Sequence, residues 1–204
     1  MSNNFNIIGL FPIPIIKIKF KDHYKYRFPE VEKRDNRPDS WNCSVYTTFP
    51  DINADDPLVP YSIQQNLKND LITCIANVFE QLNFPINIHI PQFWYNIYHD
   101  NQGQEEHHHL PQVGEASLPF WSGIYYNKNA SPTNFKRTDF AYLTQSFPNN
   151  MKSELAPAYA DSYSPDVEDG DIVLFPPYLP HKVKSLDKHK DEMRMTFSFN
   201  IELK

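Results

Sequence analysis

Residues 193–203, MRMTFSFNIEL, alternate strictly between apolar and polar side chains, and this stretch decides the fold class. The apolar positions are Met193, Met195, Phe197, Phe199, Ile201 and Leu203, and the polar positions are Arg194, Thr196, Ser198, Asn200 and Glu202. Successive side chains of a β-strand point to opposite faces of a sheet. A period of two over this length therefore predicts a half-buried strand.

Shorter segments of the same character precede this strand. Ile86, Ile88 and Ile90 alternate with polar residues, and β-branched or aromatic residues dominate 41–49, 93–99, 120–126 and 171–175. Residues 9–20 are apolar and carry prolines, which suits an extended segment at a sheet edge. Residues 127–165 are polar and irregular, which predicts a long loop or lid. Many short strands of this kind are typical of an antiparallel barrel or jelly roll.

Residues 61–83 are the one segment with a helical period. Apolar side chains recur there at steps of four and three, at Ile63, Leu67, Leu71, Ile75, Val78 and Leu82. Ser62 is placed to cap the start, and Asn83 and Pro85 mark the end. We expect a mainly β fold with a double-stranded β-helix (jelly-roll) core and this one long N-terminal helix in support.

Length and composition limit the number of domains and the classes of function that the chain can have. The 204 residues fit a single domain over 1–204, and 40% hydrophobic with 15% aromatic residues excludes wholesale disorder. Only 5 glycines argue against a Gly-rich phosphate loop, and a net charge of −6 argues against bulk nucleic-acid binding. A local lysine patch runs against that average, although it also fits a solvated loop: Lys182, Lys184, Lys188 and Lys190.

The expected lack of a targeting signal and the small number of cysteines favour a cytoplasmic protein. No apolar run is long enough to span a membrane, since Pro12 and Pro14 interrupt residues 7–16 and no basic residue precedes them. The two cysteines, Cys43 and Cys74, are best read as free thiols in a reducing compartment. The sequence is compatible with either a monomer or a homodimer.

Three consecutive histidines are the first candidate site. In EEHHHLP (105–111), His107 and His109 are two residues apart. On an extended segment both imidazoles point the same way and can reach one metal ion, while His108 points to the opposite face. The alternative is a solvated histidine run at the end of a strand.

A second segment favours the metal. EDGDIVLFPPYLPHKV (168–183) reads as a turn, a buried strand, a proline-stiffened turn and then His181. A His-x-His pair with a remote histidine on another strand is the pattern of a three-point metal site.

Arg194 is the third element of the pattern. It lies on the polar face of the alternating strand, thirteen residues after His181. If that face lines the barrel, a buried guanidinium needs an anion, and it pairs with a carboxylate in bidentate fashion. If the face meets solvent, Arg194 is an ordinary surface charge.

Together these pieces resemble the Fe(II)- and 2-oxoglutarate-dependent oxygenases, and most of all the small phage and bacterial group of this family. The resemblance spans roughly residues 9–201 through GLFPIPI (9–15), FWYNIY (93–98), QEEHHH (104–109), WSGIYY (121–126), GDIVLFPPYLPHKV (170–183) and RMTFSFN (194–200). It implies a dioxygenase, an oxidoreductase that oxidises its substrate in the manner of a hydroxylase and releases succinate and CO2. Its cofactors would be Fe(II), 2-oxoglutarate, chelated through its 1-carboxylate and 2-oxo group, and O2.

The resemblance also carries roles to single residues. His107 matches the first metal ligand and His181 the distal one, and Arg194 matches the arginine that pairs with the remote carboxylate of 2-oxoglutarate. Thr196 stands where the family often has a serine that assists this arginine, and Tyr126 matches a tyrosine whose hydroxyl reaches the same carboxylate. Asn96 or Tyr98 would lie near the metal-bound end of the cosubstrate.

One position departs from the broad superfamily, which uses His-x-Asp or His-x-Glu. Here the second position is His109, so the expected ligand set is His107, His109 and His181. Three neutral imidazoles leave an Fe(II) site with a charge of about +2. Imidazole also suits Zn, Cu or Ni, and Glu115 or Asp139 could supply a carboxylate from a loop.

Two other readings remain open. His107-x-His109 with Glu115 and then 165–181 also looks like the two cupin motifs, which would give a metal or small-ligand protein of the same barrel without need of Arg194. An inactive structural or interaction domain is the third reading.

The substrate is expected to be a small molecule or a peptide. Aromatic residues of the 127–165 segment could enclose it, or could simply pin that segment to the barrel: Phe135, Phe140, Tyr142, Tyr159 and Tyr163.

Overall fold

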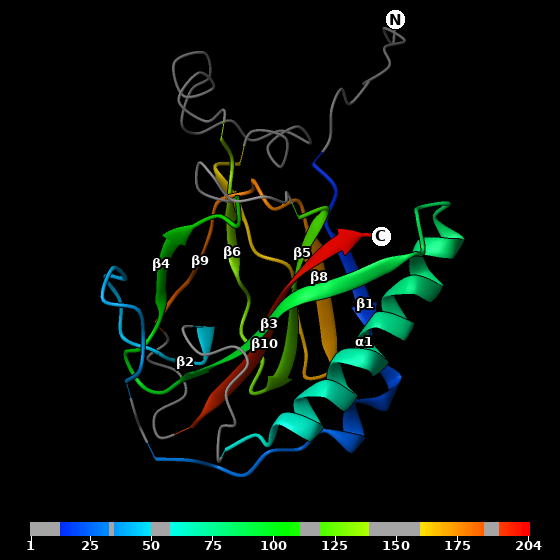
Figure 1. Ribbon diagram of the computed structural model, residues 1–204. Helices are drawn as coiled ribbons and strands as arrows, with labels where there is room; N and C mark the ends of the chain where they lie inside the picture. Colours follow the sequence, from blue (N-terminus) through cyan, green and yellow to red (C-terminus); the bar gives the residue numbers. More distant parts are fainter. Residues whose placement is uncertain (1–12, 33–34, 50–57, 111–118, 139–159, 186–191) are drawn as a thin grey trace, which may run out of the picture.

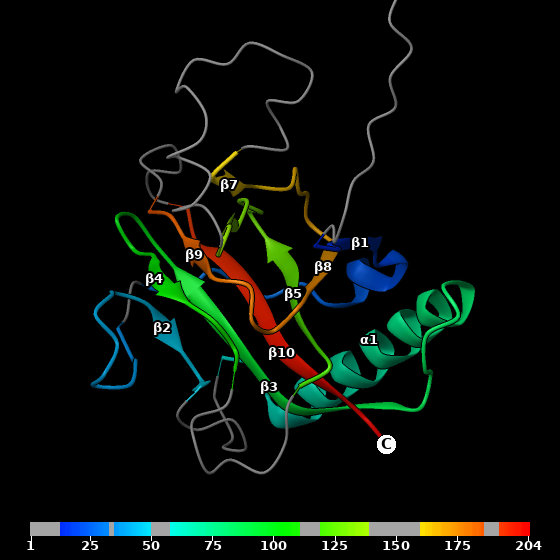
Figure 2. The ribbon, with the colours of Figure 1, turned by 90° about the horizontal axis from the view of Figure 1, so that it is seen from above.

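The structure, a computed structural model, describes residues 13–32, 35–49, 58–110, 119–138, 160–185 and 192–204. Two antiparallel sheets face each other, and one helix lies along the outside of the larger sheet (Figures 1 and 2). The larger sheet has the order β1-β8-β5-β10-β3-β2, and the smaller has the order β4-β9-β6-β7. This is the predicted mainly β jelly roll with its supporting helix.

The larger sheet consists of β1 (Ile16–Lys19), β8 (Asp171–Phe175), β5 (Trp121–Lys128), β10 (Arg194–Leu203), β3 (Ile88–Tyr98) and β2 (Tyr46–Thr47). The smaller sheet consists of β4 (Gln104–His107), β9 (His181–Val183), β6 (Asn134–Lys136) and β7 (Ser162–Tyr163). A short 3-10 helix, Lys21–Lys25, follows β1. In the described part of the chain, no helix combines the length and the apolar character that crossing a bilayer requires.

Strand β10 occupies the centre of the larger sheet, between β5 and β3. The prediction that it is half-buried is wrong, because both of its faces are buried from Arg194 to Ile201. The apolar face packs into the main core beneath the helix, through Met195, Phe197, Phe199 and Ile201. The polar face is covered as well, because it looks toward the smaller sheet. The alternation predicted the strand and its register, and the second sheet supplied the additional burial.

Helix α1 (Tyr61–Gln81) packs its apolar stripe on β3 and the core. Leu67, Leu71, Ile75 and Phe79 are fully buried, and each such side chain contributes about 1.5–3 kcal/mol. The predicted Ser62 cap is wrong, because Pro60 holds the N-cap position and no side chain caps the helix. The predicted end is right: Asn83 adopts φ 56°, a left-handed conformation that asparagine tolerates.

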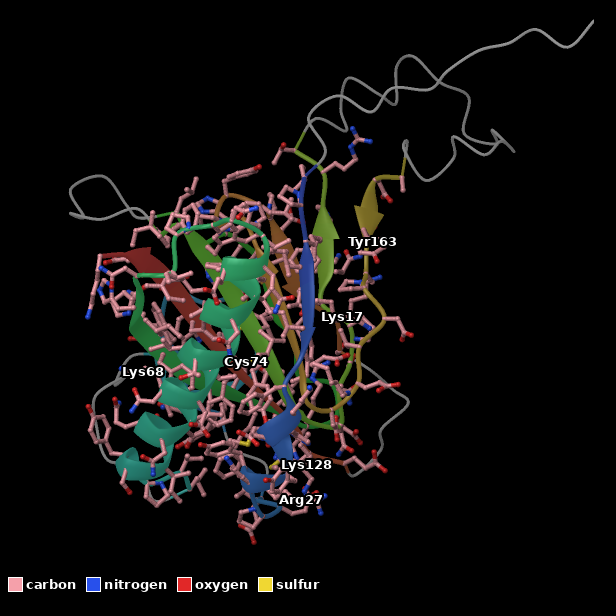
Figure 3. All side chains as sticks on the ribbon, turned by 90° about the vertical axis from the view of Figure 1, so that its right-hand side faces the viewer. Lys17, Arg27, Lys68, Cys74, Lys128 and Tyr163 are labelled. Carbon is pink, nitrogen blue, oxygen red and sulfur yellow. The ribbon has the colours of Figure 1, made fainter. Side chains whose placement is uncertain are left out.

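Several predicted boundaries changed. The two strands expected at 86–90 and 93–99 are one continuous strand, β3, and the strand expected over 41–49 is reduced to the two residues of β2. The expected 127–165 loop contains β6 and β7, while 139–159 lie outside the described residues. Strand β1 is an edge strand as predicted, and both cysteines are free, Cys74 on α1 as labelled in Figure 3.

Candidate functional site

Three histidines meet between the two sheets, at one end of the barrel. His107 ends β4, His181 begins β9, and the two residues are direct cross-strand partners. Their ring centroids lie 4.2 Å apart, and the His109 ring lies 5.5 Å from His107 and 5.0 Å from His181. One ring nitrogen of each residue lies within 4.8 Å of the others, so the cluster could hold a metal ion. His108 is exposed on the opposite side, as predicted.

Each of these imidazoles is oriented by a hydrogen bond at Nδ1. The Nδ1–H of His107 donates to the Glu105 carbonyl oxygen (2.9 Å), and that of His181 donates to the Leu179 carbonyl oxygen (3.0 Å). His109 Nδ1–H donates to Asn200 Oδ1 (2.9 Å), which also accepts from the Ser122 hydroxyl (2.8 Å). Carbonyl oxygens only accept, so this network assigns the proton to Nδ1 and leaves the Nε2 lone pairs for a metal.

Burial keeps the three rings neutral. Loss of hydration lowers the pKa of His107, and it lowers the pKa of His109 to about 3, with a further contribution from the neighbouring His107. The pKa of His181 falls well below its usual range because the ring is desolvated and faces the two other imidazoles. Neutral imidazole is the form that binds metals, so this donor set is ready for one near neutral pH.

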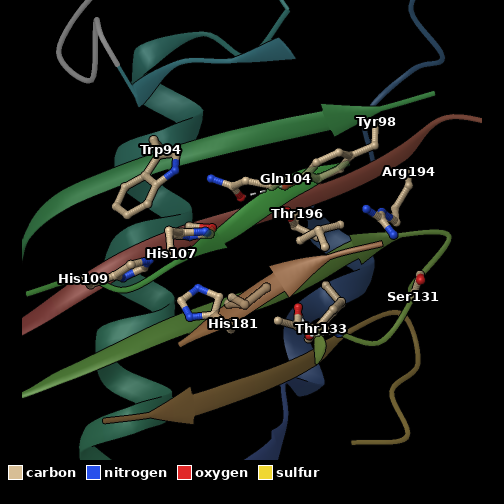
Figure 4. A pocket seen from close by; sticks show the side chains of 14 residues that line it. Trp94, Tyr98, Gln104, His107, His109, Ser131, Thr133, His181, Arg194 and Thr196 are labelled. Carbon is tan, nitrogen blue, oxygen red and sulfur yellow. Dashed lines mark hydrogen bonds between the residues drawn. The ribbon is translucent and has the colours of Figure 1, made fainter. Parts of the chain in front are cut away.

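A pocket extends from the histidines toward Arg194 at the opposite end (Figure 4). Its cavity volume is about 20 Å³, measured as the space open to the centre of a water-sized sphere, so side chains fill most of the region between its two ends. Both sheets contribute to its walls: Trp94, Tyr98, Gln104, Ile124, Tyr126, Ser131, Thr133, Val183, Thr196 and Ser198 join the histidines and Arg194. Of the described lining residues, none is Asp or Glu.

Arg194 is buried in this pocket, and no counter-ion pairs with it among the described residues. The residue is 6% exposed, and its Nε and Nη2 atoms have no hydrogen-bond partner in the same part of the chain. The guanidinium carbon lies 4.3 Å from the centroid of the Tyr98 ring. Burial lowers the pKa of Arg194, yet a guanidinium stays protonated in proteins. A buried, unpaired cation requires an anion, and a carboxylate matches its planar donors.

The other predicted cosubstrate residues divide into two groups. Thr196 and Tyr126 are cross-strand partners and both line the pocket, where the Tyr126 hydroxyl donates to Thr133 Oγ1 (2.9 Å). Asn96 is buried beside Thr196 and donates to Ser198 Oγ (3.1 Å), so it reaches the pocket only through that serine. Tyr98 lies against Arg194 and not at the histidine end, contrary to the prediction.

Some predicted groups lie elsewhere. Glu115 and Asp139 are outside the described residues, as are Phe140, Tyr142, Tyr159, Lys188 and Lys190. Phe135 is buried with its ring centroid 5.7 Å from that of His181, and it is not among the residues that line the pocket. Tyr163 is exposed.

Sequence reasoning missed the residues that orient His109 and close the histidine end. Asn200 and Ser122 hold the His109 ring, and Trp94 lies beside it with ring centroids 5.7 Å apart. The signal for Asn200 was its place on the polar face of the alternating strand. Trp94 could have been found from its spacing, because it lies two and four residues before Asn96 and Tyr98 and so shares their face of the strand.

A family model described as "Putative 2OG-Fe(II) oxygenase" matches residues 92–200, a range that contains the three histidines and Arg194. The chain belongs to this oxygenase family. It is therefore an oxidoreductase that uses Fe(II), 2-oxoglutarate and O2 and releases succinate and CO2. The donor set fits these groups, because three neutral imidazoles can hold the metal and the unpaired Arg194 suits a carboxylate.

Solved oxygenase structures share the fold at low sequence identity. HygX from Streptomyces hygroscopicus, solved with nickel, 2-oxoglutarate and hygromycin B, is 12% identical with a TM-score of 0.52, over 94% of this chain and 83% of that one. SnoK, a non-heme alpha ketoglutarate dependent carbocyclase from nogalamycin biosynthesis, is 9% identical with a TM-score of 0.53, over 93% of this chain and 79% of that one. No curated protein matches the chain in sequence.

Proposed function

We propose that His107, His109 and His181 hold Fe(II) through their Nε2 atoms, and that Arg194 binds the remote carboxylate of 2-oxoglutarate in the same pocket. The observation that carries the proposal is a buried guanidinium that has no counter-ion among the described residues, in one pocket with three preoriented imidazoles. A cupin-like metal protein has no need for such a cation.

The side chains at the two ends of the pocket would have different roles, metal binding at one end and cosubstrate binding at the other. When bound, the iron supplies the redox chemistry that couples decarboxylation of 2-oxoglutarate to oxidation of the substrate. Three protein ligands on one side leave open coordination positions. Arg194 would orient the cosubstrate, with the hydroxyls of Thr196 and Tyr126 beside it, and Ile124 and Val183 would keep that part of the pocket apolar. With no carboxylate among the described lining residues, the site would favour a dianionic cosubstrate.

The proposal is tested by anaerobic titration of the protein with Fe(II) and then 2-oxoglutarate, followed by a pulse of O2. We expect one metal ion and one 2-oxoglutarate per chain, and succinate after the pulse in an amount that a suitable substrate increases. A metal-loaded protein that binds no 2-oxoglutarate in calorimetry would contradict the proposal and favour the cupin-like reading.

Asn200 is expected to set the metal affinity through His109. In Asn200→Leu the Nδ1–H of His109 loses its amide acceptor and keeps only the Ser122 hydroxyl, the ring is held less firmly, and metal affinity should fall about 10- to 100-fold. Asn200→Asp keeps an acceptor oxygen and should retain most of the affinity. Competition with a chelator measures both variants, and equal loss in the two would assign Asn200 a packing role only.

We further propose one oxygenase domain over residues 1–204, a small-molecule or peptidyl substrate, and a cytoplasmic location. The described strands from β1 to β10 build one two-sheet core, which supports the single domain. HygX was solved with hygromycin B, which makes a small-molecule library the first choice for substrate screening. Two free thiols fit a reducing compartment, and the net charge of −6 disfavours bulk nucleic-acid binding.

A further inference from the structure

Trp94 presents an unused hydrogen-bond donor to the histidine end of the pocket. It lies on β3, is 4% exposed, and lines the pocket beside His109 (Figure 4). Its indole Nε1 is buried and has no hydrogen-bond partner among the described residues. Buried donors in folded proteins are nearly always paired, so this N–H requires an acceptor.

Two polar groups beside Trp94 are already engaged, whereas Asn96 Oδ1, two residues along β3, is buried without a hydrogen-bond partner among the described residues. His109 Nδ1 is bonded to Asn200 and Ser122, and Ser198, the cross-strand partner of Trp94, accepts from Asn96. Trp94 also packs edge-on against Phe49, with ring centroids 5.1 Å apart, a packing role that phenylalanine could serve without an N–H. Since Nε1 is paired neither with Asn96 Oδ1 nor with any other described group, we look for its acceptor in what the pocket binds.

The unpaired donors of the pocket gather at its two ends. Among the described lining residues, the buried side-chain atoms without a partner are Trp94 Nε1 and the Nε and Nη2 atoms of Arg194. All three donate. Trp94 pairs with Ser198, and Tyr98 pairs with Arg194, so the two donor groups are four residues apart along the strands, about 13 Å between their backbones.

We infer that Trp94 Nε1–H binds an oxygen atom of the cosubstrate at its 2-oxo acid end, as the counterpart of Arg194 at the remote carboxylate. The inference rests on the proposed function, since it needs 2-oxoglutarate to enter with one end at the histidines. Trp94 is then a binding residue that fixes the orientation of the cosubstrate. A molecule with acceptors at both ends would pair with the unpaired donors found among the described lining residues.

The test replaces Trp94 with β-(3-benzothienyl)alanine, in which sulfur takes the place of the indole N–H and the shape is kept. Binding is measured by calorimetry on the anaerobic, Fe(II)-loaded protein. Two probes are used: 2-oxoglutarate, and 2-oxopentanoate, which keeps the 2-oxo acid end and lacks the remote carboxylate. Loss of one hydrogen bond to a charged acceptor should weaken binding of both probes about 10- to 100-fold.

Matched variants separate the two ends of the pocket. Arg194→Met should weaken 2-oxoglutarate and leave 2-oxopentanoate unchanged, whereas the Trp94 isostere should weaken both. The same isostere at Trp121, a core residue outside this pocket, should change neither affinity. Trp94→Phe is a second variant without the N–H, and metal stoichiometry near one reports that each variant is folded.

The outcomes are distinguishable. If both Trp94 variants bind the two probes within twofold of the unsubstituted protein, Trp94 does not contact the cosubstrate, and the proposed function stands without it. If the isostere weakens 2-oxoglutarate but not 2-oxopentanoate, the N–H serves the remote carboxylate and the assignment of ends is wrong. If the unsubstituted protein binds no 2-oxoglutarate, the proposed function and this inference fail together.

Discussion

Replacing His181 by alanine is expected to abolish stoichiometric metal binding and, with it, succinate formation. His181 is the most central of the three imidazoles, because its ring centroid lies 4.2 Å from that of His107 and 5.0 Å from that of His109. Removal leaves two neutral ligands, and no carboxylate among the described lining residues can replace the third. Loss of an outer-shell partner alone costs about 10- to 100-fold in metal affinity, so loss of a ligand should cost more.

Metal content after dialysis and succinate yield after an O2 pulse measure this effect. His108→Ala is the matched control, because His108 belongs to the same histidine run but is exposed on the other side. His181 also contacts Phe135 and Phe175 in the core, so circular dichroism should accompany each measurement. Full turnover by His181→Ala would remove this residue from the metal site, and His107→Ala is subject to the same test.

The sequence was informative about the histidines because their spacing is local. Two residues at i and i+2 share a face of an extended segment whatever surrounds them, and the structure places His107 and His109 together and His108 apart. The ligand partners that orient the rings could not be predicted in the same way. Asn200 is 91 residues from His109 in sequence, and only the pairing of β10 in the sheet brings its side chain to Nδ1.

The burial of Arg194 could not be predicted from the sequence pattern. Strict alternation predicts which residues share a face, but it cannot tell whether the polar face meets water or another sheet. The structure resolves this choice by placing β4 and β9 over the polar face of β10, which buries Arg194 and Thr196. The prediction that Ser62 caps the helix was also wrong. It relied on the local preference of serine for N-cap positions, whereas Pro60 occupies the N-cap of α1.

Arg194→Met is expected to raise the dissociation constant for 2-oxoglutarate about 30-fold or more while leaving Fe(II) binding unchanged. Truncating one partner of a buried charge pair costs about 2–5 kcal/mol, and Arg194 lies at the end of the pocket away from the histidines. Arg194→Lys keeps the charge but loses the planar set of donors, so it should recover only part of the affinity.

Arg194→Met should weaken 2-oxoglutarate binding, but it should not destabilise the unliganded protein. Arg194 is 6% exposed and its Nε and Nη2 atoms lack partners among the described residues, so burial of the guanidinium costs free energy until an anion binds. Methionine, an unbranched apolar side chain that ends near the position of the arginine Nε, removes that cost, and the free energy of unfolding without ligand should stay equal or rise. Added 2-oxoglutarate should then stabilise the metal-loaded wild type in thermal unfolding far more than the variant, because only ligands that bind the native state raise its stability. A destabilised Arg194→Met protein with an unchanged 2-oxoglutarate requirement would assign this arginine to the fold and not to the cosubstrate.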